Sequence, residues 1–125
     1  MTYKLGTRSN QSLSGVHVDL VAVVKRAIEI TEVDFSVIEG IRHIERQRQL
    51  VKEGKSTTLN SRHLTGHAVD MVPYPVDWED LERFELMAEA MKLASKELEI
   101  SIKWGGDWKN FYDAPHFELD RKKYK

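Results

Sequence analysis

The feature that most constrains the fold is a long apolar stripe that runs through residues 77–98. Its apolar side chains recur every three or four positions, which predicts one long helix that is capped at its start by Asp77. The residues on the central face of this helix are Leu81, Phe84, Met87, Ala88, Met91, Ala94 and Leu98. The residues that widen this face are Leu86, Ala90 and Leu93. A helix with so broad an apolar face needs cover on most of its sides, so we expect it to be the central, buried helix.

The spacing of apolar residues predicts the other elements as well. One helix is expected over residues 16–31, with Ser14 as its N-cap, and another from Ile44 to Gly54, where glycine favours a stop. Residues 55–62 are polar and predict a loop. Short β-branched or alternating segments predict strands at 35–41, 68–72, 100–104 and 116–119.

These elements predict an α+β fold in which about three helices pack on a short, mainly antiparallel sheet. The chain has 125 residues, and two domains of half that length would each have difficulty burying an adequate core. We therefore expect residues 1–125 to form a single small domain.

The composition excludes several classes of function. There is no cysteine, which rules out disulfides, thiolate metal sites and a cysteine nucleophile, so a tightly held metal ion must bind His, Asp or Glu. With 19 Lys and Arg against 20 Asp and Glu, the net charge of −1 argues against a nucleic-acid partner. No apolar run is long enough to span a bilayer, and residues 1–15 lack the apolar core of a secretory signal.

Three side chains suggest a metal site. Asp70 interrupts the apolar strand at 68–72, where an ionised carboxylate is costly unless it is paired or binds a metal ion. His63 precedes Asp70 by seven residues, and Gly66 between them can supply the bend that lets both point to one spot. His116 begins the last strand, after Asp113. Two imidazoles and one carboxylate would leave one position open, as in catalytic zinc sites.

These residues carry a family resemblance. The pattern Ser61-x-His63-x-x-Gly66-x-Ala68-x-Asp70, followed by Asp113-x-x-His116-x-Glu118, resembles the signature of zinc peptidases that cut peptidoglycan stem peptides. That family includes D-Ala-D-Ala carboxypeptidases and dipeptidases, and phage L-alanyl-D-glutamate endopeptidases. Residues 13–17 and 104–108 are similar to the same family.

The resemblance implies a role for each matching position. His63, Asp70 and His116 would bind one Zn²⁺ per chain, and Asp113 would serve as general base and then as general acid. Arg42 resembles the family arginine that faces the scissile carbonyl or a substrate carboxylate. Ser61 and Glu118 resemble positions that orient the ligands. Two departures are Val18, at a place where proline is frequent, and an Asp base where the dipeptidases carry Glu, which favours the endopeptidase branch.

Some residues have a simpler interpretation. His67 lies four residues after His63, as in helical zinc peptidases, but Gly66 and the strand that follows argue against a helix, so we expect no ligand there. His17 and His43 have no partner in the pattern. Arg42 could instead pair with an acidic neighbour such as Glu45. The residues with a predicted structural or solvent-exposed role are Trp104, Trp108 and the basic tail 121–125, for which weak attraction to an anionic cell wall is an alternative.

The sequence and the resemblance together predict a phage endolysin that hydrolyses the L-alanyl-D-glutamate bond of stem peptides during host cell lysis. The alternatives are a D-alanyl-D-alanine carboxypeptidase, a non-catalytic zinc-binding recognition module, and a metal nuclease that uses His63, His67 and the basic tail. We expect a monomer with no wall-binding domain and no stable membrane insertion. It would accumulate in the host cytoplasm and reach the wall after a separate protein permeabilises the membrane.

Overall fold

A computed structural model describes residues 2–56, 61–109 and 112–125 of the chain. Part of the predicted loop at 55–62, namely residues 57–60, lies outside these ranges. Across the described ranges, no helix combines the length and the apolar character that crossing a bilayer requires.

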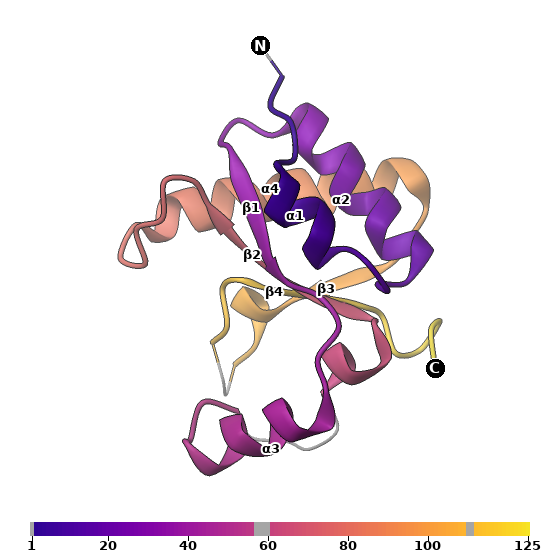
Figure 1. The fold of residues 1–125 in the computed structure, drawn as a ribbon. Helices are drawn as coiled ribbons and strands as arrows, with labels where there is room; N and C mark the ends of the chain where they lie inside the picture. Colours follow the sequence, from indigo (N-terminus) through magenta and orange to yellow (C-terminus); the bar gives the residue numbers. More distant parts are fainter. Residues whose placement is uncertain (1, 57–60, 110–111) are drawn as a thin grey trace.

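A four-stranded antiparallel sheet forms the middle of the molecule (Figure 1). Its order is β1-β2-β4-β3, and the bounds are β1 (Phe35–Glu39), β2 (Ala68–Pro73), β3 (Ile102–Trp104) and β4 (His116–Leu119). The predicted α+β class is thereby confirmed. The strands at 35–41 and 100–104 are shorter than predicted. In β1, the register shifts between Val37 and Glu39. Glu39, which pairs with Asp70, is the last paired residue of this strand.

Two helices, α2 (Val18–Ile30) and α4 (Leu81–Leu98), cover one face of the sheet, and α1 (Thr7–Ser12) packs beside the edge strand β1, where Ser9 accepts a hydrogen bond from the backbone N–H of Val37. The apolar side chains of α2 and α4 form one core with those of the strands. Helix α3 (Ile44–Lys52) lies apart from them, on the other side of the sheet (Figure 1). Two 3-10 helices, η1 (Arg62–Thr65) and η2 (Gly105–Asp107), precede β2 and follow β3. The sheet therefore has one face buried in the core and a second face that is available for a functional site.

The helix starts differ from those predicted. The N-cap of α2 is His17 rather than Ser14, because its Nδ1 accepts a hydrogen bond from the backbone N–H of Asp19 at 3.0 Å. The N-cap of α4 is Asp80, whose carboxylate accepts from the N–H of Arg83. Asp77 instead accepts from the N–H of Glu79 in the turn before the helix. Helix α1 was not predicted because its sequence, TRSNQS, has no apolar periodicity.

The apolar stripe of α4 is narrower than expected. Phe84, Met87 and Met91 are buried, but three leucines that were assigned to the buried face are exposed: Leu81, Leu93 and Leu98. The helix packs against α2 and the sheet and leaves one flank in solvent. It is therefore central to the core but not covered on all sides.

This difference predicts two unequal substitutions in α4. Met87 is 0% exposed, so Met87→Ala should lower the free energy of unfolding by about 2–5 kcal/mol through lost contacts and a cavity. Leu93 is 56% exposed, so Leu93→Ala should change the free energy of unfolding by less than about 1 kcal/mol. Urea denaturation of both variants measures these values. Equal losses would contradict the orientation of α4.

Candidate metal centre

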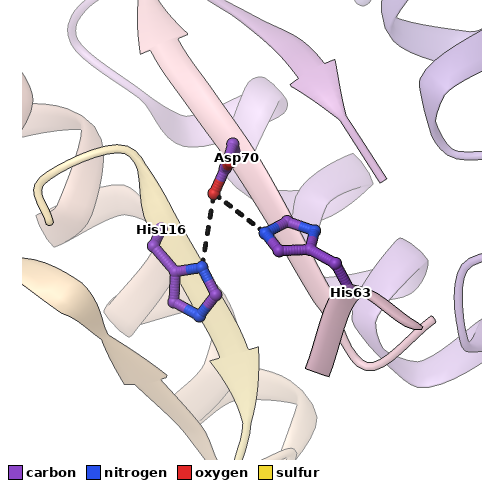
Figure 2. Close-up of side chains that lie close together, drawn as sticks. All are labelled: His63, Asp70 and His116. Atoms are coloured by element: carbon purple, nitrogen blue, oxygen red, sulfur yellow. Dashed lines mark hydrogen bonds and ion pairs between the residues drawn. The ribbon is translucent and has the colours of Figure 1, made fainter. Parts of the chain in front are cut away.

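Three side chains that lie far apart in the sequence converge on one point (Figure 2). Oδ1 of Asp70 lies 3.1 Å from Nε2 of His63 and 3.3 Å from Nδ1 of His116. The three residues could hold a metal ion, because one ligand atom from each lies within 4.8 Å of the others. Among the described residues no other group of His, Asp and Glu meets this condition.

The sheet places two of these residues side by side. Asp70 on β2 is paired directly with His116 on β4, and side chains directly opposite each other in antiparallel strands share a face. Val69 and Met71, the neighbours of Asp70, point to the core on the opposite face. The alternation along β2 therefore buries apolar groups on one side and presents the carboxylate on the other.

His63 reaches the same point from η1. Ser61 accepts a hydrogen bond from the N–H of His63 at 3.2 Å and caps this short helix. Gly66 ends it with a φ of 77°, a left-handed conformation that favours glycine. A β-carbon at Gly66 would lie 2.7 Å from the carbonyl oxygen of Gly15. The bend that the sequence suggested at Gly66 is confirmed, and it turns the chain from His63 into β2.

Each imidazole is oriented by a second partner. Nδ1 of His63 lies 2.8 Å from the carbonyl oxygen of Gly40, which can only accept, so Nδ1 carries a proton and Nε2 faces Asp70. Nε2 of His116 donates to Glu118 at 2.9 Å, so Nδ1 faces Asp70. Such outer hydrogen bonds hold metal-binding imidazoles in position in many proteins.

Burial and charge oppose each other at this site. Burial alone would raise the pKa of Asp70, but hydrogen bonds from His116 and His63 outweigh it and hold this pKa well below its usual range. Burial alone would lower the pKa of His116, whereas Asp70 and Glu118 raise it to about 9. Burial alone would raise the pKa of Glu118, but hydrogen bonds from His116 and Arg121 outweigh it and lower this pKa. A cation that binds Nδ1 of His116 must therefore displace a proton.

The donor set fits zinc. Two imidazole nitrogens and one carboxylate oxygen are ligands that zinc accepts, and all three come from buried or half-buried side chains. Three protein ligands leave a coordination position for water or substrate, whereas structural zinc sites are usually closed by four.

Arg42 is held beside the site by several contacts. Its Nε forms an ion pair with Glu39, one Nη donates to Gln47 at 2.6 Å, and the other lies 3.5 Å from Oδ2 of Asp70. Its partners are therefore Glu39 and Asp70 rather than the suggested Glu45. The side chain is only 9% exposed, so its orientation is fixed before any ligand arrives.

A cleft of about 680 Å³ opens over these residues. Asp113 lines it, as do the three converging residues, Arg42 and Glu118. Burial, together with the charge of Asp70, raises the pKa of Asp113. Its backbone position is tight, because a β-carbon at Gly105 would lie 2.2 Å from the carbonyl oxygen of Asp113. A carboxyl group with a raised pKa in such a cleft is suited to accepting and returning a proton.

The structure shows several contacts that the sequence did not reveal. Glu39, the partner of Arg42, is opposite Asp70 in the sheet, and its position at the end of an apolar strand is the only sequence signal for it. His67 lies outside the converging group, and its ring is 5.3 Å from that of His17. The ring of Trp108 lies 5.0 Å from that of His116. Trp104 is buried in the core.

The basic tail is more ordered than a solvated end. The hydroxyl of Tyr124 donates to Asp19 at 2.7 Å, and the guanidinium of Arg62 donates to the Tyr124 carbonyl at 2.5 Å. Arg121 donates to Glu118 at 3.1 Å. The tail therefore connects the start of α2 with η1 and with the outer partner of His116.

Comparison with known proteins decides the family. The family model of the phage L-alanyl-D-glutamate peptidases matches residues 1–124. The chain belongs to this family. This match confirms the resemblance that the motifs suggested. It also confirms that the protein belongs to a class of peptidases.

Two curated relatives and one solved structure are similar to this family member. The L-alanyl-D-glutamate peptidase of Escherichia phage T5 is 36% identical, over 95% of this chain and 99% of the relative. The peptidoglycan L-alanyl-D-glutamate endopeptidase CwlK of Bacillus subtilis is 26% identical, over 77% of this chain and 66% of the relative. The crystal structure of the L-Ala D-Glu endopeptidase ChiX of Serratia marcescens has a TM-score of 0.91 and 46% identity, covering 97% of this chain and 93% of that one.

The tight turn at Gly66 generates a prediction. Gly66 and Gly54 both have left-handed φ angles, of 77° and 76°, but a β-carbon meets another residue only at Gly66. Gly54→Ala should cost about 1 kcal/mol of stability from backbone strain alone, and Gly66→Ala should cost clearly more.

Because Gly66 positions His63, Gly66→Ala should also weaken binding of added zinc, whereas Gly54→Ala should not. Urea denaturation and calorimetric zinc titration measure the two effects. Equal behaviour of the two variants would contradict the close approach of Gly66 to Gly15.

Proposed function

We propose that this protein is a zinc-dependent endolysin that hydrolyses the L-alanyl-D-glutamate bond of peptidoglycan stem peptides. The observation that carries the proposal is the convergence of His63, Asp70 and His116 in a cleft of a chain that belongs to the L-alanyl-D-glutamate peptidase family. The names of the curated relatives and of the solved ChiX structure support this choice of bond.

His63, Asp70 and His116 would hold the ion through Nε2, a carboxylate oxygen and Nδ1. When bound, zinc supplies Lewis-acid polarisation of a carbonyl and lowers the pKa of water at the open position. Glu118 and the Gly40 carbonyl keep the two imidazoles turned toward Asp70. In our proposal Ser61 acts indirectly, by capping the short helix that carries His63.

Asp113 is the proposed proton carrier. Its carboxylate accepts a proton from the attacking water and then donates it to the amine nitrogen of the leaving D-glutamate. The raised pKa favours this role, because it brings the carboxyl group closer to the operating pH, where the carboxylate is a stronger base and its acid form can still return the proton.

Arg42 is proposed to face the scissile carbonyl or a nearby substrate carboxylate. Glu39 and Gln47 hold its guanidinium in place, so little side-chain entropy is lost when substrate binds. A fixed cation near the reacting carbonyl stabilises the negative charge that develops on its oxygen.

We further propose that the protein acts as a monomer with one zinc ion in phage-induced lysis. The similarity to the peptidase of Escherichia phage T5 supports a role in the phage life cycle. In this proposal it accumulates in the host cytoplasm and reaches the wall once a separate protein has opened the membrane.

Replacing Asp113 by Asn tests the mechanism. Asp113→Asn should retain one zinc ion per chain but lose about 100-fold or more of the rate of muropeptide cleavage, because the proton carrier is missing. Mass spectrometry of digested muropeptides, combined with metal analysis, measures both quantities. A chelator should abolish cleavage by the unmodified protein.

The matched control is Asp107→Asn, since Asp107 is an exposed carboxylate that pairs with Lys92 and lies outside the cleft. It should cleave at the normal rate. Full activity of Asp113→Asn would refute the proton-carrier role, and release of free D-alanine instead of cleavage after L-alanine would identify a carboxypeptidase.

A further inference from the structure

One cation of the cleft has no partner in the described part of the chain. Among the described residues, five basic side chains line the cleft: Arg42, Arg46, Lys55, Arg62 and Arg121. Four of them have a partner within the protein. Arg46 forms no hydrogen bond or ion pair in the described part of the chain. Its charge is available to a ligand in the cleft.

The position of Arg46 is not explained by the stability of α3. It lies in the first turn of the helix, where the partial positive charge of the helix end disfavours a cation. The residues three and four positions away are Arg42, His43, Gln49 and Leu50, so no acidic side chain is placed to form an ion pair along the helix. Leu50, one turn further on, also lines the cleft, so this flank of α3 faces the site.

The charges of the cleft are distributed unevenly. The acidic groups Asp70 and Glu118 lie on the sheet, whereas Arg42 precedes α3 and Arg46 lies on it. Figure 1 shows α3 on the side of the sheet away from the apolar core. Arg42 forms an ion pair with Glu39, whereas Arg46 has no acidic partner in the described part of the chain. A substrate that enters this cleft therefore meets an uncompensated cation on the α3 wall.

The proposed substrate carries a matching anion. In a stem peptide, D-glutamate continues the chain through its side-chain carboxyl group, which leaves its α-carboxylate free next to the bond to be cut. On the other side of this bond, the amino group of L-alanine is joined to the acid group of the sugar through an amide, which carries no charge. Only the C-terminal part of the substrate therefore has carboxylates near the reacting bond.

We propose that Arg46 binds the free α-carboxylate of the substrate's D-glutamate residue and thereby directs the acidic end of the peptide toward α3. This inference rests on the proposed function and adds a specificity determinant to it. A guanidinium suits the task because it can donate two parallel hydrogen bonds to one carboxylate. Stem peptides in which this carboxylate is converted to an amide should lose the interaction.

Steady-state kinetics on two synthetic stem peptides tests the proposal with the zinc-loaded protein. One peptide has the free α-carboxylate and the other has the amide. Arg46→Gln should raise KM for the acid about tenfold, as expected for the loss of one charge-assisted interaction. It should change KM for the amide less than about twofold and leave kcat nearly unchanged for both. Arg46→Lys should restore part of the affinity.

Arg48→Gln is the matched control, because Arg48 is an exposed cation on the same helix that does not line the cleft. It removes the same charge and should alter neither KM. An equal KM increase on both peptides, an equal effect of Arg48→Gln, or no effect of Arg46→Gln would each overturn the inference. Failure of the unmodified, zinc-loaded protein to cleave either peptide would instead refute the proposed function, and the inference with it.

Discussion

The sharing of one buried carboxylate between two imidazoles is the interaction on which the rest of the site depends. Asp70 lies in the second strand of the sheet, where an unpaired charge would be costly, and His63 and His116 both contact its Oδ1. Each imidazole has one remaining nitrogen, which is occupied by Gly40 or Glu118. The chain therefore holds three ligand atoms close together by its own hydrogen bonds, which reduces the reorganisation needed to bind a cation.

The two faces of the sheet have different roles: one stabilises the fold and the other carries the site. Helices α2 and α4 bury the apolar face and give the strands a rigid support. The opposite face presents Asp70, His116 and Glu118 from two paired strands, where the backbone positions are set by the ladder of hydrogen bonds. Residues that must keep a fixed geometry are better placed on such strands than on loops. Helix α3 lies on this second side of the sheet (Figure 1), and its Arg46 lines the cleft.

Much of this arrangement could be predicted because its causes are local. The alternation of β2 and the apolar spacing of α2 and α4 follow from which side chains avoid water. Helix α1 escaped prediction because a six-residue polar segment has no apolar period, and its stability comes from contacts such as the bond from the N–H of Val37 to Ser9. The caps at His17 and Asp80 depended on which of several polar residues the tertiary structure turned toward the helix start.

By itself, the sequence determined the fold class, the family, and the residues whose chemistry suits a cation, because residue type and spacing are properties of the chain alone. The tertiary structure decided the strand order, the pairing of Asp70 with His116, the contacts of Arg42 with Glu39 and Gln47, and the absence of a partner for Arg46 within the described residues. The strand order and the pairing of Asp70 with His116 join segments that are distant in sequence. Their geometry is set by packing of the whole core, which no local pattern of residues encodes.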